Sequence, residues 1–477
     1  MYSHDATRPP PPPAARAAGP TSQEVLAQWI QVVPGNQDCV AGLAPKAGDA
    51  ADIPRRSVKC EPALSLRAVV WAGRAASPEG TCPSFSKTQG GTTSVHAMTE
   101  RKKNGIDGFA DIMVCEAPLD TKAESLAVHH GKLMTLPPAW REGTEPSPIV
   151  VSGDTGCRRD ARQKCEPGPK DNQWRFADVS KAQASKWPAL AIHVGDYLYV
   201  KKDDWAAWNE YFFAPGRPLL ERAPWIPIRG NHENCGHGDA PAGYNLFFGT
   251  GPAVPCPIAD EQLVTYALDL SPRVRLIVSD SSLAYATSPE ATIVSNCSRG
   301  ADEAMCARMI EVVKDVNRFA SAAGGGRDVW LATHVPVFAL DRDDDEQPFI
   351  PDSSVMMLAA WRGAGGKGVK VVFSGDRHLF QVVTKSDPGA PMQFVVGTGG
   401  VALDPLPHGP VETDFLGAVP PPASAHPAPA VRRVGWSGCS YRGNGFLTAT
   451  HSGSKYQFKF ESLNPPPAGG RCIITVY

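Results

Sequence analysis

Five apolar runs of strand length in this chain each end at a residue with an oxygen or nitrogen ligand in its side chain. The runs cover residues 148–153, 189–195, 224–230, 329–333 and 369–375, and the polar residues that follow them are Asp154, Asp196, Asn231, His334 and Asp376. Glycine directly precedes four of the five, which lets the backbone turn sharply. Because the strands of layered α/β folds end at a shared crevice, we expect these side chains to converge there.

An α/β domain is expected over residues 146–404, because strands and helices alternate there. Helical periodicity covers residues 302–323 and, over a shorter length, residues 354–362. Residues 264–270 and 274–280 are typical of a hairpin. At 477 residues the chain has room for this domain and for accessory modules.

The rest of the chain divides by composition. Residues 1–63 contain a proline run and an apolar periodicity at 25–33, which predict a disordered or linker segment with one short helix. Residues 64–145 consist of short β-branched runs between turn formers, which predict a small antiparallel β domain. Residues 405–430 are rich in proline and predict a loop, while residues 431–477 predict strands that pack on the α/β domain.

Composition excludes some classes of function. A formal net charge of −2 and a hydrophobic content of 42% describe an ordinary globular protein without a basic surface for nucleic acid. No apolar run reaches membrane-spanning length, and residues 1–5 lack the apolar region of a secretory signal. Either a signal has been removed or the protein stays inside the cell.

The twelve cysteines favour a secreted or periplasmic protein with disulfides. They contain no Cys-x-x-Cys pair, so their spacing does not match a zinc ribbon. Pairing cannot be derived from sequence, and the candidate bridges join Cys82 with Cys115, Cys157 with Cys165, Cys235 with Cys256, Cys297 with Cys306, and Cys439 with Cys472. The alternative is a cytosolic enzyme with scattered buried thiols.

Two further groups fit structural roles better than functional ones. His96, His129 and His130 suggest a second metal site, but adjacent histidines on a loop are more often solvated. A stripe of aromatic side chains has helical spacing and is expected to face the core rather than line a substrate pocket. It consists of Trp205, Trp208, Phe212 and Phe213.

Seven side chains make up the candidate site when the residues just beyond the strand ends are included. They are Asp154, Asp196, Tyr199, Asn231, His334, Asp376 and His378. This number exceeds what one first-row ion needs, so two ions that share a bridging carboxylate fit the count. Hard oxygen ligands combined with imidazoles suit iron, manganese or zinc.

In their order along the chain, these residues resemble the five sequence blocks of the calcineurin-like metallophosphoesterases. The blocks are Asp154-Thr155-Gly156, Gly195-Asp196, Gly230-Asn231-His232-Glu233, His334 and Gly375-Asp376-Arg377-His378. Tyr199, three residues after Asp196, is the mark of the purple acid phosphatase branch. The resemblance spans residues 148–400 and implies a two-sheet β sandwich flanked by helices, with a β domain in front of it.

The resemblance also implies how the ligands divide. One ion would be held by Asp154, Asp196, Tyr199 and His378, and the other by Asp196, Asn231, His334 and Asp376. Only a strongly Lewis-acidic ion holds a phenol as phenolate near neutral pH, so Tyr199 predicts iron(III) in the first site. The second site would hold iron(II), manganese or zinc.

Asp376 departs from the family pattern, which usually has histidine at this position. The extra negative charge favours iron(II) or manganese over zinc in the second site. The alternative is that Asp376 bonds a neighbouring residue and that the second site is weak or empty.

The implied activity is that of an acid phosphatase, which hydrolyses phosphomonoesters through a metal-bound hydroxide. Asp196, Asn231 and His232 are the candidate catalytic residues, and His232 would protonate the leaving oxygen. Arg158 and His237 are candidates for contact with the phosphate, although ordinary surface roles fit them equally well.

Two other functions stay open at this point. The first is a phosphodiesterase or nucleotidase that uses the same site. The second is a surface-binding protein that keeps the fold but has lost one metal through Asp376. The expected partner is a small phosphate ester, and the sequence does not determine the oligomeric state.

Overall fold

A computed structural model describes most of the chain between residues 24 and 475. The described segments are 24–41, 59–72, 82–251, 253, 263–284, 303–342, 348–349, 352–385, 390–404, 417–418, 435–463 and 473–475, without positions 104–105, 162, 169, 171, 237, 325 and 340. The predicted proline-rich loop lies almost entirely outside them. None of the described helices has the length and apolar character needed to cross a bilayer.

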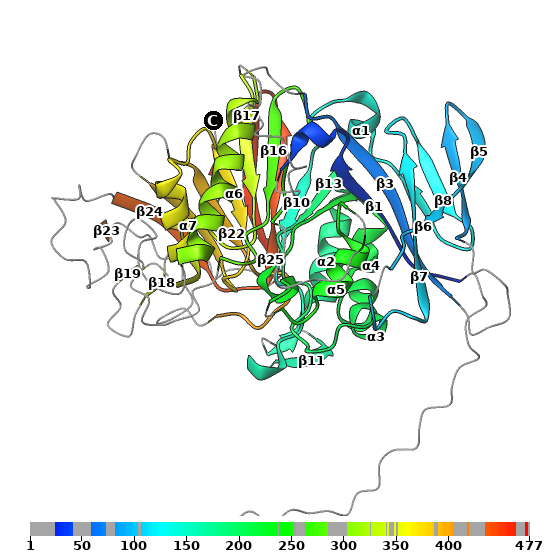
Figure 1. The fold of residues 1–477 in the computed structure, drawn as a ribbon, viewed down its shortest axis with the longest axis horizontal. Helices are drawn as coiled ribbons and strands as arrows, with labels where there is room; N and C mark the ends of the chain where they lie inside the picture. Colours follow the sequence, from blue (N-terminus) through cyan, green and yellow to red (C-terminus); the bar gives the residue numbers. More distant parts are fainter. Residues whose placement is uncertain are drawn as a thin grey trace, which may run out of the picture.

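Two large mixed sheets form the centre of the fold (Figure 1). The order of the first is β27 (Ile473–Thr475), β26 (Lys455–Ser462), β25 (Gly445–Ser452), β10 (Ile149–Ser152), β13 (Leu190–His193), β14 (Pro224–Pro227), β1 (Val25–Pro34), β3 (Pro62–Trp71), β7 (Ile112–Leu119) and β6 (Thr99–Glu100). The order of the second is β2 (Val40–Ala41), β15 (Thr265–Asp269), β16 (Val274–Ser279), β17 (Asp328–Ala332), β20 (Val371–Ser374), β22 (Met392–Val396), β21 (Phe380–Lys385), β24 (Gly435–Tyr441) and β23 (Gly417–Ala418).

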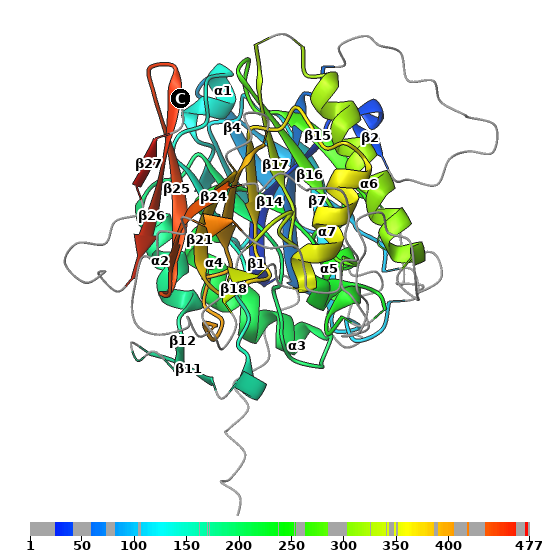
Figure 2. The ribbon, with the colours of Figure 1, turned by 90° about the vertical axis from the view of Figure 1, so that its left-hand side faces the viewer.

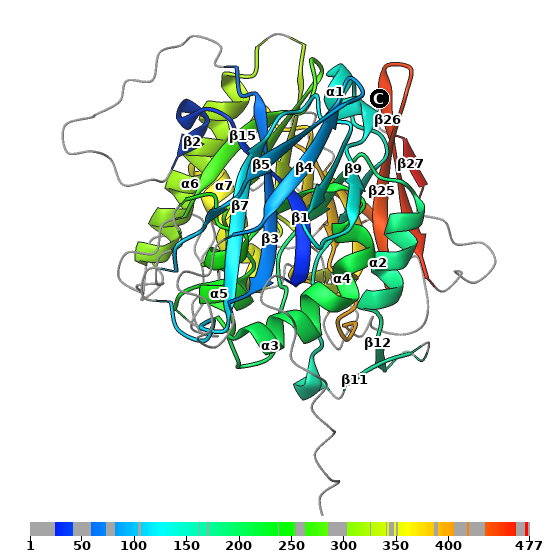
Figure 3. The same cartoon turned by 90° about the vertical axis from the view of Figure 1, so that its right-hand side faces the viewer.

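Three smaller sheets complete the described strands. The four-stranded one lies beside the N-terminal strands (Figure 3). It consists of β5 (Thr92–Ala97), β4 (Ser84–Gln89), β8 (Ser125–Val128) and β9 (Leu133–Thr135). The two-stranded ones pair β11 (Lys164–Pro167) with β12 (Gln173–Trp174) and β18 (Asp341–Arg342) with β19 (Pro348–Phe349).

Helices cover the outer faces of the two large sheets. α6 (Glu303–Ser321) and α7 (Asp352–Gly363) pack together beside the second sheet (Figure 2). The other described helices are α1 (Pro138–Glu142), α2 (Phe176–Ser185), α3 (Trp205–Trp208), α4 (Ala214–Leu220) and α5 (Pro241–Phe247), with a π-helical turn at Asn209–Phe213 and short 3-10 turns at Gln37–Cys39, Arg159–Ala161 and Asn231–Glu233. The helices predicted at 302–323 and 354–362 and the hairpin predicted at 264–280 are therefore confirmed.

Three apolar clusters separate the layers. The first lies between the two sheets and contains Ile192 and Trp330. The second lies between the first sheet and the α2–α5 helices and contains Ala191. The third lies under α6 and α7 and contains Leu331. Adjacent residues of one strand thus enter different clusters, because successive side chains of a strand point to opposite faces. The predicted α/β class and two-sheet sandwich flanked by helices are confirmed.

The short helix predicted at residues 25–33 is wrong, because β1 occupies this segment. β1 pairs in parallel with β14 and antiparallel with β3, so it lies inside the large sheet. Trp29 enters the helix-facing cluster and Ile30 enters the cluster between the sheets. A strand buried on both faces has a nearly continuous apolar sequence, which periodicity alone does not distinguish from a buried helix.

The predicted β domain at residues 64–145 shares its strands with the rest of the fold. β3 and β7 belong to the ten-stranded sheet, and only β4, β5, β8 and β9 form the separate antiparallel sheet. The boundary predicted near residue 146 therefore does not interrupt the large sheet. The division of the chain into domains stays a prediction.

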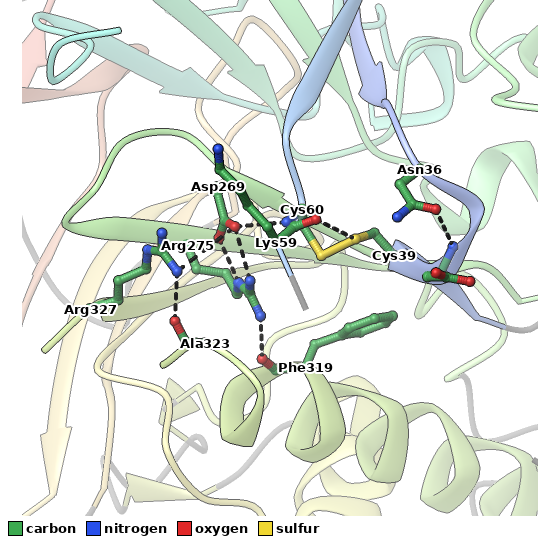
Figure 4. Close-up of a disulfide and its surroundings, with 10 residues drawn as sticks. Asn36, Cys39, Lys59, Cys60, Asp269, Arg275, Phe319, Ala323 and Arg327 are labelled. Atoms are coloured by element: carbon green, nitrogen blue, oxygen red, sulfur yellow. Dashed lines mark hydrogen bonds and ion pairs between the residues drawn. A yellow bond between two sulfur atoms is a disulfide. The ribbon is translucent and has the colours of Figure 1, made fainter. Parts of the chain in front are cut away.

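Three disulfides lie within the described part of the chain. The predicted bridges of Cys82 with Cys115 and of Cys157 with Cys165 are confirmed. An additional bridge joins Cys39 and Cys60 (Figure 4). The amide of Cys60 donates to Asp269, which also accepts two hydrogen bonds from Arg275. This cluster connects the segment after β1 to the second sheet.

Other predicted bridges involve residues outside the described ranges. Cys235 and Cys306 are disulfide-bonded, but their predicted partners Cys256 and Cys297 are not described. Cys472, the predicted partner of Cys439, is not described either. These three pairings stay predictions.

The aromatic stripe that begins at Trp205 lies in the core, as expected. Trp208, Phe212 and Phe213 are buried in the cluster under the first sheet, and Trp205 packs against it. His129 and His130 are exposed and stack on each other with ring centroids 3.9 Å apart. His96 is exposed as well, and its Nε2 lies 2.8 Å from Oγ of Ser94, so the three histidines lie at the surface.

Candidate metal centre

Five parallel strands bring the predicted ligands to one edge of the sandwich. β10, β13 and β14 pair in parallel in the first sheet, and β17 and β20 do so in the second. Asp154, Asp196 and Asn231 follow the strands of the first sheet, and His334 and Asp376 follow those of the second. The side chains that the sequence predicted to converge therefore lie together where the two sheets meet.

The three aspartates share an unusual backbone conformation. Asp154, Asp196 and Asp376 have φ values of 57°, 59° and 68°, in the left-handed region. A non-glycine residue in this region costs on the order of 1–2 kcal/mol, and such strain concentrates at functional sites. The three strands that precede these aspartates thus each end in a turn, and the residue with the strained backbone carries the carboxylate.

The first cluster of ligands surrounds the hydroxyl of Tyr199. This oxygen lies 3.0 Å from Oδ1 of Asp154, 3.0 Å from Oδ2 of Asp196 and 3.1 Å from Nε2 of His378. Ligand atoms of Asp154, Asp196 and His378 all lie within 4.8 Å of one another, and all three residues are buried. These four side chains are the set that the resemblance assigns to the first ion.

The second cluster surrounds Nε2 of His334. This nitrogen lies 2.8 Å from Oδ1 of Asn231, 3.3 Å from Oδ1 of Asp196 and 4.0 Å from Oδ1 of Asp376. The side chains of His334 and Asp376 are 0% and 3% exposed, so neither carboxylate nor imidazole is solvated by bulk water. Asp196 contacts both clusters, through Oδ2 on one side and Oδ1 on the other.

Glycines at the strand ends leave room for the ligands. A Cβ on Gly230 would collide with Asp196, and one on Gly375 would collide with Oδ2 of Asp154. The glycines before the ligands are therefore required by the close approach of the carboxylates as well as by the turns.

The ionisable groups of the site shift one another's pKa values. Burial raises the pKa of Asp154 above its ordinary value. Burial also opposes ionisation of Asp196, but the positive charges of His334 and His232 hold its pKa below the usual range. Burial lowers the pKa of His378, yet hydrogen bonds with Asp154 and Asp404 outweigh this effect and raise it to about 10. The carboxylates thus draw positive charge onto the imidazoles.

The residues present fit a bound cation. The Tyr199 hydroxyl has one proton to donate, but two carboxylate oxygens lie at hydrogen-bond distance from it. A cation among the first-cluster atoms would satisfy both carboxylates and the phenol oxygen together. Carboxylate, phenol and imidazole ligands are those that iron and other hard or borderline ions accept. The structure contains a candidate metal site, as the sequence predicted.

The imidazoles of His378 and His334 are each oriented by a contact of Nδ1. Nδ1 of His378 lies 3.5 Å from Oδ1 of Asp404, and its backbone amide donates to the same carboxylate at 3.0 Å. Nδ1 of His334 lies 2.7 Å from the carbonyl oxygen of Val194 and donates to it. Such outer partners fix the ring orientation and the tautomer of metal-binding histidines. Asp404 has no motif around it, so its role was not predicted from the sequence.

Glu233 organises the loop that bears Asp196. Its carboxylate accepts hydrogen bonds from the backbone amides of Gly230, Asp196, Tyr197 and Leu198 at 2.9–3.2 Å. Burial and the charge of Asp196 raise the pKa of Glu233 to about 8. Glu233 therefore has a structural role. In the described contacts its carboxylate bonds backbone amides and not the side-chain atoms of the predicted ligands.

His232 faces the site from the neighbouring residue. Its Nε2 lies 4.0 Å from Oδ2 of Asp196, while its Nδ1 lies 2.5 Å from Oδ2 of Asp239. The imidazole is 30% exposed, so solvent reaches it, unlike the buried side chains of the two clusters. Asp239 was not predicted, although the glycines at 236 and 238 indicate a loop that can fold back toward His232.

The two other predicted phosphate contacts have different outcomes. Nη1 of Arg158 lies 3.4 Å from Nδ1 of His378, so this side chain reaches the first cluster. His237 lies outside the described residues.

Comparison with known proteins agrees with this geometry. Residues 147–380 match the model of the family described as calcineurin-like phosphoesterase. No curated protein matches the chain.

Three solved structures are similar to this chain at low sequence identity. A structure of PhoD superposes with a TM-score of 0.50 at 11% identity, covering 96% of this chain and 90% of that one. A purple acid phosphatase from yellow lupin (Lupinus luteus) seeds has a TM-score of 0.47 at 12% identity, with 92% and 89% covered. The anchor in the inner membrane complex of Plasmodium has a TM-score of 0.38 at 12% identity, with 70% and 90% covered.

The family match covers every strand end and every ligand described above. The likeness to PhoD is a likeness of fold. Residues 147–380 are therefore the part of this chain that is similar to the calcineurin-like phosphoesterase family.

Proposed function

We propose that this protein is a binuclear-metal acid phosphatase of the purple acid phosphatase type, which hydrolyses phosphomonoesters. The observation that supports this function is the arrangement of seven potential ligands in two clusters that share Asp196. A single ion would leave one cluster of buried carboxylate and imidazole groups without a function. Unpaired buried charges are costly, so both clusters are explained best by bound ions.

The first ion would be held by Asp154, Asp196, Tyr199 and His378, and the second by Asp196, Asn231, His334 and Asp376. The phenol of Tyr199 supports iron(III) in the first site, because weaker Lewis acids do not hold a phenolate near neutral pH. Asp376 supports iron(II) or manganese rather than zinc in the second. The chemistry supplied by two such cations is activation of water and neutralisation of the phosphoryl charge.

His232 is the proton donor to the leaving oxygen in this proposal. Its Nδ1 proton is accepted by Asp239, which leaves Nε2 on the side of Asp196 to hold the proton that is transferred. Protonation of the leaving alkoxide by a positioned acid contributes about 10²–10⁴-fold to such reactions. Asp239 fixes the ring and therefore acts as a positioning residue.

A secreted or periplasmic location also belongs to the proposal. It is supported by the three bridges Cys39 with Cys60, Cys82 with Cys115 and Cys157 with Cys165. Disulfides persist in oxidising compartments and are rare in the cytosol.

The test is elemental analysis of the freshly purified protein together with turnover of a chromogenic phosphomonoester and a chromogenic phosphodiester. We expect about two ions per chain, one of them iron, and faster turnover of the monoester. Faster turnover of the diester would support a phosphodiesterase. One ion or none, without hydrolysis after reconstitution, would support the binding protein and contradict the proposal.

A further inference from the structure

Strand β16 ends at the same edge of the sandwich as the ligand-bearing strands, but no predicted ligand follows it. It pairs in parallel with β17, so the residues after it, 280–282, lie beside the end of the strand that precedes His334. Asp280, Ser281 and Ser282 are 8%, 0% and 0% exposed. Because buried polar groups normally have hydrogen-bond partners, the partners of this segment indicate its role.

Ser281 contacts the residues on both sides of His334. Its Oγ accepts a hydrogen bond from the hydroxyl of Thr333 at 2.7 Å and one from the backbone amide of Val335 at 2.8 Å. A serine oxygen has two acceptor lone pairs, so these two bonds occupy both of them. A single buried oxygen atom therefore holds the chain immediately before and immediately after His334.

The same segment contacts the turn that bears Asn231. Oδ2 of Asp280 lies 2.8 Å from Nε and 2.7 Å from Nη2 of Arg229, two residues before Asn231. Nδ2 of Asn234, three residues after Asn231, donates to the carbonyl of Ser282 at 3.1 Å. The turn is thus joined to this segment on both sides of Asn231.

Asn231 and His334 form the closest contact of the second cluster, with Oδ1 of Asn231 2.8 Å from Nε2 of His334. The strands that precede them, β14 and β17, belong to different sheets. Backbone pairing between these two strands therefore does not set this distance. Residues 280–282 contact the chain around both ligands and link the two sheets at this point.

We propose that Ser281 is a positioning residue for the second ion, because it fixes His334 relative to Asn231. This inference rests on the proposed function and concerns the same site. The carbonyl of Val194 orients the imidazole ring, and Ser281 fixes the backbone from which that ring projects. Groups that hold metal ligands in place typically contribute about 10–100-fold to metal affinity or activity.

The experiment compares S281A with the matched control S180A. Ser180 is also 0% exposed, and its Oγ donates to the carbonyl of Gly216 at 3.1 Å and accepts the amide of Leu219 at 3.3 Å. Each variant removes a buried hydroxyl that has two protein partners, so the two should lose similar amounts of stability. Only Ser281 lies beside a potential ligand.

Equilibrium dialysis against manganese(II), followed by elemental analysis, measures the Kd of the second ion and the content of the first ion in the same samples. In S281A we expect the Kd for manganese to rise about 10- to 100-fold while the first ion is retained. S180A should leave both values unchanged. At saturating manganese, monoester turnover by S281A should return toward the wild-type value, because every potential ligand is still present.

Thr333 provides a second, milder pair of variants. T333V keeps the shape of the side chain without the hydroxyl, and T333S keeps the hydroxyl. Loss of one hydrogen bond should raise the Kd for manganese by roughly two- to tenfold in T333V, whereas T333S should behave as the wild type. In the S281A background, T333V should add little, because its partner has already been removed.

Three results would overturn the inference: an unchanged Kd for manganese in S281A, an equal rise in S180A, or loss of the first ion together with the second in S281A. If S281A does not fold, an unchanged Kd in T333V overturns it instead. A wild-type protein that binds no second ion would contradict the proposed function, and the inference would fall with it.

Discussion

The two ligand clusters around Asp196 differ in their composition and in how closely they are held. In the first, the Tyr199 hydroxyl contacts all three partners at 3.0–3.1 Å. In the second, Asp376 stands 4.0 Å from His334, and a carboxylate takes the place usual for histidine. Under the proposed function, we therefore expect the phenol of the first cluster to select a highly charged ion and the additional carboxylate of the second to select a hard divalent ion.

The clusters also differ in the group behind each histidine. A side-chain carboxylate, Asp404, orients His378, whereas a backbone carbonyl of Val194 orients His334. A carboxylate raises the basicity of a metal-binding imidazole more than a neutral carbonyl does. A substitution of Asp404 should therefore weaken the first site without changing any of its potential ligands. The second site has no equivalent substitution, because the partner of His334 is a backbone carbonyl.

The largest effect is expected from Asp196→Asn, because Asp196 belongs to both clusters. The variant removes the negative charge that the two ions would share, and we expect both ions and most activity to be lost. The expected loss in kcat is on the order of 10³-fold, the scale of removing a central catalytic group. Elemental analysis and monoester turnover measure it. Retention of both ions would contradict a shared carboxylate.

Asp404→Asn should act on the first cluster alone. Outer partners of metal ligands typically contribute about 10–100-fold to metal affinity or activity, so we expect a loss of that size with the second ion retained. Asp178→Asn is the control, since this half-exposed carboxylate pairs with Arg175. Loss of the second ion in Asp404→Asn would show that the clusters are not independent.

Tyr199→Phe tests the identity of the first ion. If the phenol oxygen ligates iron(III), the oxidised wild type has a visible charge-transfer band, and the variant lacks it. The ion keeps its carboxylate and imidazole ligands, so we expect activity to fall by roughly tenfold or less. Absorption spectra of both proteins decide the point. A colourless and fully active wild type would contradict iron(III) and leave the hydrolase intact.

Asp376→His would make the second cluster resemble the usual family pattern. Replacing a carboxylate with a neutral nitrogen removes one negative charge, so preference should move from manganese or iron(II) toward zinc. Competition between manganese and zinc, followed by elemental analysis, measures this change. An unchanged ratio would mean that Asp376 does not ligate the second ion.

The smallest effect concerns His193, in the strand beneath the first cluster. Its Nδ1 accepts the amide of Gly195, and burial lowers its pKa to about 3. A depressed pKa adds stability that is complete above the unfolded value of about 6.5 and is lost as the pH falls toward the folded value. Between pH 6.5 and pH 5 this loss is about 2 kcal/mol.

Denaturant unfolding at these two pH values checks the His193 prediction. His193→Gln has no titrating ring, so its stability should fall less over this interval, although its stability at neutral pH is lower. An identical pH dependence in both proteins would show that His193 is not the residue responsible.

The ligands were predictable from sequence because each follows a strand within a short motif. Asp154, Asp196 and Asn231 stand directly after apolar runs, and no tertiary information is needed to see that pattern. Asp404 and Asp239 have no comparable pattern, since they act only through contacts to His378 and His232. Their roles depend on where two loops pass, which local sequence does not determine.

β1 and Arg158 illustrate the same limit in other ways. The sequence of β1 is apolar on both faces, so its place between β14 and β3 decided that it is a strand rather than a helix. Arg158 and Arg159 are adjacent and chemically identical. Only the fold of the loop after Asp154 places Arg158 beside His378 and Arg159 against Tyr211.

The sequence by itself determined the α/β class, the five strand ends and the seven potential ligands, because apolar runs and polar termini are local properties. Tertiary structure decided which ligands share a cluster, which carboxylates stand behind the histidines and which arginine faces the site. Those relations join residues as far apart in sequence as Asp154 and His378, and only the packing of two sheets brings Oδ1 of Asp154 within 3.4 Å of Nε2 of His378.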